Sequence, residues 1–526
     1  MAEFTLSKAD EEQIKAKGME LEKIISQTET IMRGIPYLRL QRPCIIGDGI
    51  TLIQKGDLER LSRMYSEASL AGRVMKFVPA SGAASRMFKL LLSFNNRLDP
   101  IDKEVMSASA ARGDSDSKEF LQFINGIEKF AFYDHLKAVM AKDGLDTEDL
   151  VSKGQFKDIL EYILTSKGLD YANLPKGMIM FHRYPDHSRT PFEEHLVEAA
   201  GYVQDRHGVC RIHFTVSNEN EETIKTHIEK IRNRYETSGL RMEITFSVQK
   251  PSTDTLAVDV ENRPFRDTDG RLLFRPGGHG ALLENLNDLK GDMVFIKNID
   301  NVVPDRLKHE TYVYKKAFGG YLIELQRDIF GYLKRLAEDN VDEQVVNEAF
   351  EYVRHKLSIM PPDRISRASM AEKTDFLFSR LNRPLRICGM VRNEGEPGGG
   401  PFWVENGHGT LSLQIVESSQ VDMNSVQQRA IWESSTHFNP VDLLCGVRDY
   451  LGRPFDLLQF ADANTGFVSI KSKEGRELKA LELPGLWNGA MAFWNTVFIE
   501  VPLITFNPVK TIIDLLRAEH KSAPGG

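Results

Sequence analysis

A run of small residues followed by an arginine forms a pattern that can bind phosphate. The apolar run 73–80 predicts a strand, and the loop that follows it contains Ala80, Ser81, Gly82 and Ala83. In a parallel α/β sheet, ligands bind beyond the carboxyl ends of the strands, and small residues there let backbone N–H groups approach an anion. Arg86 would add a charge-assisted contact. A tight strand–helix turn would use the same small residues, so this loop alone leaves both interpretations open.

Two further motifs add a cation and a close backbone approach. Lys176 lies in the sequence LPKG, where its ammonium group could neutralise phosphate, although an exposed loop lysine is the simpler explanation. Gly277, Gly278 and His279 lie in RPGGHG, before a helix that we expect to begin near Ala281. Glycines at a helix start suit close approach to a flat or anionic ligand, but on this motif alone a plain turn is the simpler explanation.

An acidic residue ends the fourth motif. The apolar run 292–300 ends in Asp300, which Asn301 follows. Carboxylate and amide oxygens are ligands that Mg²⁺ prefers, and the end of a parallel strand would place them at the ligand-binding edge of the sheet. An Asx turn at a strand end is the competing interpretation.

Strands and helices alternate through the middle of the chain and would position these motifs. Beyond the first strand, we expect strands over residues 177–184, 210–217, 241–249 and 292–300. Thr190, Pro191 and Glu193 predict a helix start with a capping box. This alternation requires crossover connections. The expected fold class is therefore α/β, with a Rossmann-like, mostly parallel mixed sheet.

Helical patterns interrupt this alternation and divide the chain into parts. The expected parts are an N-terminal helical segment (1–71), a core (72–303) with a helical insertion at about 90–173, a helical insertion or subdomain (304–383), and a C-terminal part that completes the sheet and the acceptor site (384–526).

Composition and charge exclude several classes of function. The 526 residues carry a formal net charge of −8, which disfavours a nucleic-acid-binding surface. No stretch approaches the roughly 18 consecutive apolar residues of a membrane span, and the polar N-terminus lacks a secretory h-region. Four scattered cysteines without a CxxC pair indicate reduced, buried thiols. We expect a cytoplasmic protein without nucleic-acid or membrane partners.

Four motifs, taken in their order along the chain, resemble those of GT-A-type nucleotidyltransferases, in particular the UDP-sugar and UDP-N-acetylhexosamine pyrophosphorylases. These motifs are PASGAASR, LPKG, RPGGHG and VFIKNIDN. Those enzymes carry a glycine-rich loop ending in arginine, a Pro-Lys-Gly segment, a Pro-Gly-x-Gly turn and a strand ending in Asp-Asn. The resemblance covers roughly residues 74–303, and the whole chain also resembles an uncharacterised bacterial family. The chain departs from the pattern at Ser81, where the family has glycine, and in the long insertion between Arg86 and Lys176.

The resemblance implies a reaction and a cofactor. A nucleoside triphosphate, UTP by analogy, would transfer its nucleoside monophosphate to a sugar 1-phosphate and release pyrophosphate. Mg²⁺ would be held by Asp300 and by a late ligand, for which we choose Asn488 with Asn495 as the alternative. A turn anchored in the core by tryptophan would explain the Asn488 segment equally well.

The resemblance also assigns roles to side chains and loops. Arg86, Lys176 and Lys479 are implied to counter phosphate charge, although a solvated charged loop also explains the stretch around Lys479. The implied nucleotide-binding residues are Ala80, Ser81, Gly82, Ala83, Gln249, Gly277, Gly278 and His279.

Two other functions remain compatible with the sequence. One is a catalytically silent nucleotide- or nucleotide-sugar-binding regulatory protein. The other is a GT-A glycosyltransferase that uses Asp300 to hold the diphosphate of a ready-made nucleotide sugar. Whether the protein forms oligomers is left open by the sequence.

Overall fold

The structure is a computed structural model that describes residues 6–97, 101–237, 239–395, 398–405 and 409–521. Residues 1–5 of the expected N-terminal segment and residues 522–526 of the expected C-terminal part therefore lie outside the described residues. None of the helices in the described ranges is both long and apolar enough to span a bilayer.

A mixed sheet forms the centre of the molecule. Its strands, in spatial order, are β2 (Ile45–Ile46), β3 (Gly49–Thr51), β19 (Asn495–Glu500), β12 (Leu385–Arg392), β16 (Asp442–Gly446), β11 (Met293–Lys297), β4 (Val74–Pro79), β7 (Val209–Val216) and β8 (Arg241–Val248). Every neighbouring pair is parallel except the two pairs that involve β16. The short β15 (His437–Phe438) pairs antiparallel with β12. The expected mostly parallel, mixed α/β sheet is confirmed.

Both faces of this sheet are covered, because successive side chains of a strand point to opposite faces. On β11, Met293 and Phe295 belong to a core that includes the helices α3 (Lys55–Leu70), α10 (Pro191–Tyr202) and α13 (Lys308–Leu336). Val294 and Ile296 belong to the opposite core, which includes α12 (Leu282–Asp288). A strand buried on both faces is mostly apolar, and β11 is apolar at every position except Lys297 at its end.

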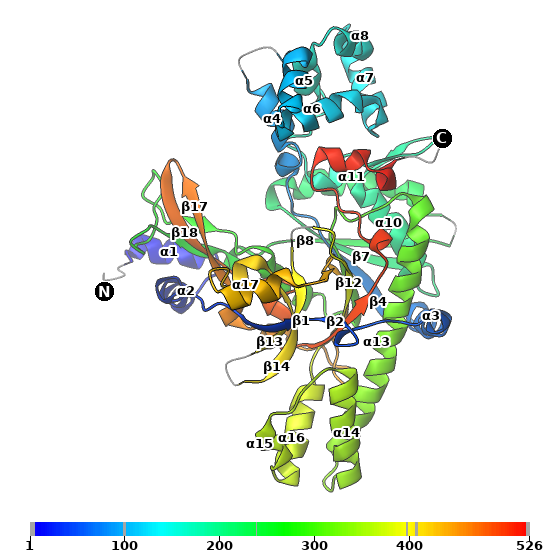
Figure 1. The fold of residues 1–526 in the computed structure, drawn as a ribbon, viewed down its shortest axis with the longest axis vertical. Coiled ribbons are helices and arrows are strands. Elements are labelled where there is room, and N and C mark those ends of the chain that lie inside the picture. Colours follow the sequence, from blue (N-terminus) through cyan, green and yellow to red (C-terminus); the bar gives the residue numbers. More distant parts are fainter. Residues whose placement is uncertain (1–5, 98–100, 238, 396–397, 406–408, 522–526) are drawn as a thin grey trace.

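A group of helices follows the small-residue loop and has its own core. It consists of α4 (Lys89–Asn95), α5 (Lys103–Ala111), α6 (Ser115–Asn125), α7 (Tyr133–Lys142), α8 (Thr147–Ser152) and α9 (Phe156–Leu164), and we call it the helical lobe. Its apolar core is rich in phenylalanine and also contains Val509, Ile512 and Leu515 from the end of the chain. Figure 1 shows the helical lobe at one extreme of the molecule, above α11 (Glu221–Tyr235).

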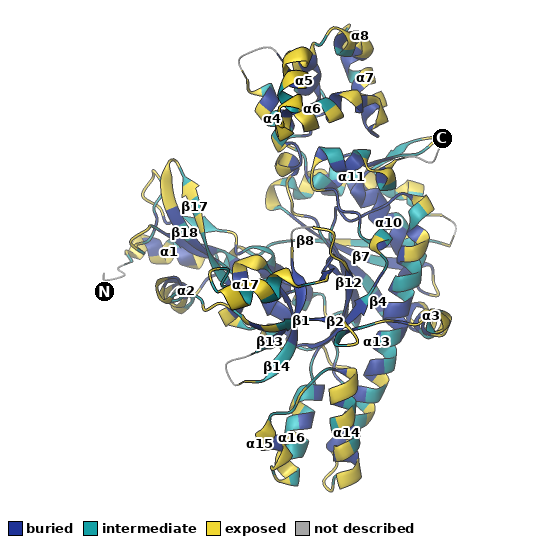
Figure 2. Ribbon diagram, viewed as in Figure 1, coloured by how far each residue is buried: buried dark blue, intermediate teal, exposed yellow. Residues whose placement is uncertain are grey.

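Helices at the opposite extreme continue from α13. They are α14 (Glu343–Lys356), α15 (Asp363–Ser366) and α16 (Met370–Leu381), and they project away from the sheet (Figure 1). Figure 2 shows that their outer faces are exposed, whereas the strands of the central sheet are buried. The two helical groups therefore extend from opposite edges of the central sheet.

Two smaller sheets lie beside the central one. The first contains β1 (Arg39–Pro43), β13 (Gly400–Glu405) and β14 (Leu411–Val416), with α17 (Val426–Glu433) against β1. The second contains β10 (Phe274–Arg275), β9 (Thr255–Val258), β18 (Arg476–Glu482) and β17 (Phe467–Lys473), and it contacts α2 (Leu21–Arg33), which follows α1 (Lys8–Ala16).

The expected strand over residues 177–184 is wrong. The segment begins with a 3₁₀ turn at Lys176–Met178, and only β5 (His182–Arg183) is extended in a ladder, paired with β6 (Ser188–Arg189). Its apolar side chains Ile179 and Phe181 pack into the core of the helical lobe. A short apolar run does not reveal by its periodicity whether it enters a sheet or another core.

The predicted helix start at Thr190 is confirmed. The Thr190 side chain accepts a hydrogen bond from the Glu193 N–H, and the Glu193 carboxylate accepts one from the Thr190 N–H. Pro191 occupies the first turn of α10. This cap fixes where α10 begins, and α10 contributes a buried glutamate beneath the candidate site.

Candidate functional site

Asp300 lies just beyond the carboxyl end of β11, where two lysines contact its carboxylate. Its Oδ2 accepts hydrogen bonds from Lys176 Nζ at 2.7 Å and from Lys510 Nζ at 3.2 Å. Asp300 is 6% exposed, and its Oδ1 is buried without a described hydrogen-bond partner. Burial opposes ionisation, but the two ammonium groups outweigh it and hold the pKa of Asp300 below its usual value. The carboxylate is therefore charged at neutral pH and has one unused oxygen.

Main-chain hydrogen bonds hold Lys176 against the small-residue loop. The Ala84 N–H donates to the Leu174 carbonyl at 3.2 Å, and the Lys176 N–H donates to the Gly82 carbonyl at 3.2 Å. Ala83 and Pro175 form an isolated bridge between these two segments. The structure thus brings the loop and the LPKG segment together, although the helical lobe separates them in the sequence.

The loop itself begins at the carboxyl end of β4. Ala80 is buried and its N–H donates to the Thr215 carbonyl at 2.8 Å. Ser81, Gly82 and Ala83 are exposed. Arg86 ends the next 3₁₀ turn, is exposed, and forms no ion pair with a described residue. The accessible backbone of the loop therefore lies beside the segment that carries Lys176, and Arg86 follows the loop three residues after Ala83.

Lys510 is a member of this site that the sequence analysis missed. It lies in the last part of the chain (residues 502–521, the C-terminal tail), where the Val509 N–H donates to the Asp300 carbonyl at 3.1 Å. The Asn507 N–H donates to Asn301 Oδ1 at 3.0 Å, and Asn301 forms a bridge with Pro508. No motif marked Lys510, because only tertiary packing returns the tail to the end of β11.

The remaining predicted glycines lie in a second cluster. A Cβ on Gly277 would stand 2.6 Å from the Thr253 carbonyl oxygen, and Gly278 adopts a positive φ of 76°. His279 stacks on Trp487 at 4.2 Å between ring centroids, and its Nδ1 accepts from the Leu486 N–H at 3.1 Å. Close packing against the late loop at residues 482–488 therefore accounts for the glycines on structural grounds.

Asn488 belongs to this second cluster. Its Nδ2 donates to Glu417 Oε1 at 2.9 Å, and the same carboxylate oxygen lies 3.8 Å from His279 Nε2. Asn488 Oδ1 is buried without a described hydrogen-bond partner. No described hydrogen bond or ion pair joins Asn488 to Asp300, so their pairing as metal ligands stays a prediction.

Gln249 and Lys479 lie apart from the lysine–aspartate group. Gln249 follows the end of β8 and is half-buried. Lys479, on β18, donates from Nζ to the Val260 carbonyl at 2.9 Å and to Asn262 Oδ1 at 3.0 Å. Neither residue forms a described hydrogen bond with the Asp300 site. Asn495, the alternative metal ligand, begins β19, and its Nδ2 donates to the Leu381 carbonyl at 3.3 Å.

A buried charge network lies beneath the site. Glu198 on α10 accepts from Lys76 Nζ at 2.9 Å and from Lys297 Nζ at 2.8 Å, and none of the three is more than 1% exposed. Burial lowers the pKa of Lys76 to about 8 against the attraction of Glu198. Lysines inside the apolar strands β4 and β11 were visible in the sequence, and such buried charges require partners.

A buried histidine joins this network to the end of β11. Burial and the neighbouring lysines hold the pKa of His195 well below its usual value, so its ring is neutral. His195 Nε2 lies 3.2 Å from the Ile299 carbonyl, to which the neutral tautomer that carries its proton on Nε2 can donate. His195 therefore supports the backbone directly before Asp300.

Solved structures with a similar chain trace include two pyrophosphorylases of UDP-sugars. One is the UDP-N-acetylglucosamine pyrophosphorylase of Trypanosoma brucei (13% identity, covering 97% of this chain and 79% of that one, TM-score 0.48). A UDP-glucose pyrophosphorylase of Leishmania major with bound UDP-glucose has 11% identity, the same coverages and a TM-score of 0.43. At these values the likeness describes the arrangement of the chain and says nothing of its activity.

A family model gives the assignment that the sequence itself supports. No curated protein matches the chain significantly. The model described as "Domain of unknown function (DUF4301)" matches residues 7–521, which is nearly the whole chain. The four cysteines are free and buried, as expected. The protein belongs to the DUF4301 family.

Proposed function

We propose that the protein is a nucleotidyltransferase that transfers a nucleoside monophosphate from a nucleoside triphosphate to a sugar 1-phosphate. The observation that carries this proposal is the pair of lysines on one buried carboxylate, next to an exposed small-residue loop at the carboxyl edge of the sheet. This edge is where α/β sheets bind ligands. We propose UTP as the donor because of the motif resemblance.

In the proposed reaction, an oxygen of the sugar 1-phosphate attacks the α-phosphorus of the triphosphate. The bond between the α-phosphorus and the bridging oxygen breaks, and pyrophosphate leaves with the electron pair. The attacking phosphate is ionised at neutral pH, so no general base is required. Positioning and charge neutralisation are the work left to the protein.

The residues around Asp300 suit that work. Lys176, Lys510 and Arg86 supply three positive charges that can follow the triphosphate and the departing pyrophosphate. The exposed backbone of Ser81 and Gly82 can approach phosphate oxygens. When substrate is bound, the lysine ammonium groups interact with the phosphate oxygens and correspondingly less with the Asp300 carboxylate.

The site can accept a magnesium ion through one carboxylate. Asp300 Oδ1 is a buried oxygen without a hydrogen-bond partner among the described residues, which fits a cation that takes one or two carboxylates and completes its shell with substrate phosphates and water. Such an ion would supply charge stabilisation to the transferring phosphoryl group. Among the described residues, no group of three or more His, Cys, Asp or Glu side chains is arranged to hold a metal without substrate.

A second candidate function is a protein that binds nucleotides without turnover. The observation in its favour is that Asp300 is already paired with two lysines, which compete with a metal for its charge. A glycosyltransferase has less support, because two lysines and an uncommitted arginine exceed the positive charge that a metal-bound diphosphate needs.

The experiment that tests the proposal combines nucleotide binding with release of pyrophosphate. Thermal shifts with UTP, ATP, GTP, CTP and dTTP, with and without Mg²⁺, are expected to single out one triphosphate, because a ligand of the folded state raises its stability. A coupled assay then measures pyrophosphate released with hexose 1-phosphates. Asp300→Asn should abolish release, whereas the exposed, lysine-paired Asp149→Asn should not.

The outcomes separate the candidate functions. Binding without release in the wild-type protein would favour the silent binding protein. A shift with UDP-sugars and none with triphosphates would favour the glycosyltransferase. No shift with any nucleotide would refute the proposal.

A further inference from the structure

A cavity with both apolar and polar lining residues lies at the edge of the central sheet opposite Asp300. It has a volume of about 360 Å³ and is lined by the end of α16, by β14 and by the segment that enters β19. Asp300 follows the carboxyl end of β11, whereas Asn495 and Thr496 of this cavity begin β19, which runs parallel to β11. The cavity is therefore separate from the proposed catalytic site.

Two arginines in the cavity wall form no ion pair with an acidic residue of the described ranges. Arg380 and Arg383 are half-buried, and neither forms an ion pair with a described residue. Arg383 donates from Nε to the Ser379 carbonyl at 2.8 Å and from Nη1 to the Phe493 carbonyl at 3.1 Å, which fixes its guanidinium group. Arg380 lies over the ring of Phe376, 5.4 Å from its centroid.

These arginines carry a charge that no carboxylate of the described residues compensates by an ion pair. Burial and the nearby Arg380 lower the pKa of Arg383 to about 10, and burial and Arg364 lower the pKa of Arg380. Both guanidinium groups remain charged at neutral pH. Two partly desolvated positive charges repel each other, which raises the free energy of the folded state. An oxyanion bound between them would lower that free energy.

The acidic residues of the wall are already engaged elsewhere. Glu405 accepts from Gln41 and lies 3.4 Å from Arg39 Nε, and Asp462 accepts from the Asn464 N–H at 3.0 Å. Neither carboxylate neutralises the two arginines. The positive end of the cavity is thus open to an anion from outside the chain.

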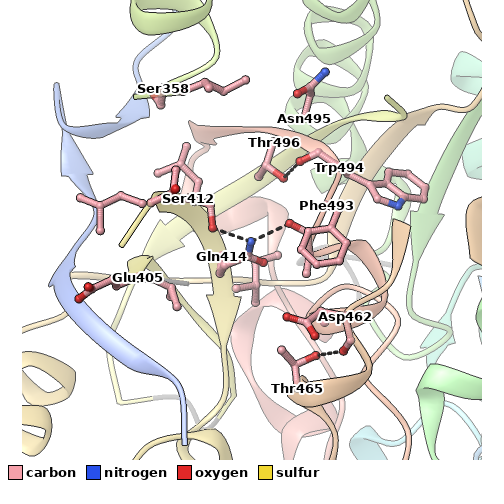
Figure 3. A pocket seen from close by; sticks show the side chains of 18 of the residues that line it. Ser358, Glu405, Ser412, Gln414, Asp462, Thr465, Phe493, Trp494, Asn495 and Thr496 are labelled. Atoms are coloured by element: carbon pink, nitrogen blue, oxygen red, sulfur yellow. Dashed lines mark hydrogen bonds between the residues drawn. The ribbon is translucent and has the colours of Figure 1, made fainter. Parts of the chain in front are cut away.

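The rest of the wall suits the body of a small polar ring. Figure 3 shows Gln414 in the wall, with its Nε2 hydrogen-bonded to Ser412 Oγ at 3.0 Å and to the Ala492 carbonyl at 2.9 Å. These two bonds orient the amide and leave Oε1 without a described donor. Phe493 is 40% exposed and offers an aromatic face. A hydroxyl of a ligand could donate to the Gln414 oxygen while its ring packs on Phe493.

We infer that this cavity binds a phosphate ester of sugar size. Arg380 and Arg383 hold the phosphate, and Gln414 and Phe493 contact the sugar ring. Guanidinium forks match phosphate oxygens in a planar, bidentate geometry, and the volume lies within the range of small-molecule pockets. Because the cavity lies at the opposite edge of the sheet, its ligand is distinct from the nucleotide and sugar 1-phosphate of the proposed reaction.

Isothermal titration of the full-length protein tests this inference. The probes are glucose 6-phosphate and N-acetylglucosamine 6-phosphate, with inorganic phosphate and citrate as simpler anions. We expect a sugar phosphate to bind at least tenfold more tightly than inorganic phosphate or citrate. The double variant Arg380→Gln/Arg383→Gln should weaken that binding at least tenfold while its unfolding temperature shows that it remains folded.

Two control variants identify where the sugar phosphate binds. Arg429→Gln removes an exposed arginine of α17 that forms no ion pair with a described residue, and it should leave binding unchanged. Lys176→Ala weakens the other phosphate site and should also leave binding unchanged, which separates this inference from the proposed function. Binding that survives the double arginine variant, is lost with Lys176, or is matched by citrate would overturn the inference. Failure of every probe to bind would overturn it as well.

Discussion

Lys510 and Asp300 lie 210 positions apart in the chain, yet Lys510 Nζ is 3.2 Å from Asp300 Oδ2. The Asp300 carbonyl also accepts from the Val509 N–H, so backbone and side chain of the same aspartate contact the C-terminal tail. Ile512 and Leu515 of the tail pack into the core of the helical lobe. The tail therefore connects the helical lobe to the end of β11, and it delivers a positive charge there.

The first prediction concerns the charge of Lys510. Lys510→Ala should raise the KM for the triphosphate or lower kcat/KM for pyrophosphate release by about tenfold to a hundredfold, because a hydrogen bond to a charged group contributes about 1.5–3 kcal/mol. Steady-state kinetics of the coupled assay measure the change. Lys510→Arg should recover part of the loss, and the exposed Lys153→Ala should have no effect. Unchanged kinetics in Lys510→Ala would remove Lys510 from the proposed site.

The second prediction concerns the buried network of Glu198, Lys76 and Lys297. Glu198→Ala leaves two buried ammonium groups without their carboxylate, and removal of one partner of a buried pair costs about 3–5 kcal/mol. Chemical denaturation should show this loss in the free energy of unfolding. The exposed Glu222→Ala, which removes only a surface pair, should change it by less than about 0.5 kcal/mol. Equal effects of the two variants would show that the network is not buried as described.

The third prediction concerns acid sensitivity of the tail. His520 Nδ1 lies 2.9 Å from His182 Nε2, and burial, with His182 and Arg517 nearby, lowers the pKa of His520 to about 3. An unfolded histidine titrates near pH 6.5. The unfolded state therefore binds more protons between about pH 6.5 and 3, and stability falls as the pH drops through that window.

In His520→Gln, the slope of the unfolding free energy against pH should be smaller by up to one bound proton, which corresponds to about 1.4 kcal/mol per pH unit. Unfolding free energies at pH 7, 6 and 5 measure the slope above the range in which most carboxylates titrate. His355→Gln, on an exposed helix face, serves as the control and should leave the slope unchanged. An unchanged slope in His520→Gln would show that His520 does not titrate differently on folding.

The fourth prediction concerns the close crossing of α3 and α13. A Cβ on Gly320 would stand 2.0 Å from the Leu61 carbonyl oxygen, which is backbone and cannot rotate away. Gly320→Ala should therefore destabilise the protein by about 1–3 kcal/mol, as overpacking does. Gly331 lies in the same helix with nothing within 4 Å of such a Cβ, and Gly331→Ala should stabilise by about 0.5–1 kcal/mol. Thermal unfolding of the two variants should give shifts of opposite sign.

Local patterns in the sequence determined the sheet strands and one helix start. The runs that became β4, β7 and β11 are mostly apolar because both of their faces are largely buried, whereas β8 has exposed positions on one face. The capping box at Thr190 and Glu193 involves residues three positions apart, so it could be read without tertiary information. The order of the motifs placed Lys176, Asp300 and the loop of Gly82 in one site through the resemblance to the pyrophosphorylases. For the loop and Asp300 there is also a local reason, because the ends of the parallel strands β4 and β11 meet at one edge of the sheet.

Only the tertiary structure decided which side chains are already paired and which remain unpaired. The segment 177–184 has the composition of a strand, but Ile179 and Phe181 enter the core of the helical lobe instead of a sheet. Lys510 reaches Asp300 because the tail packs against that lobe, and no spacing in the sequence encodes a contact across 210 residues. Hydrophobic periodicity specifies which face of an element is buried, whereas the partner of that face depends on how the whole chain packs.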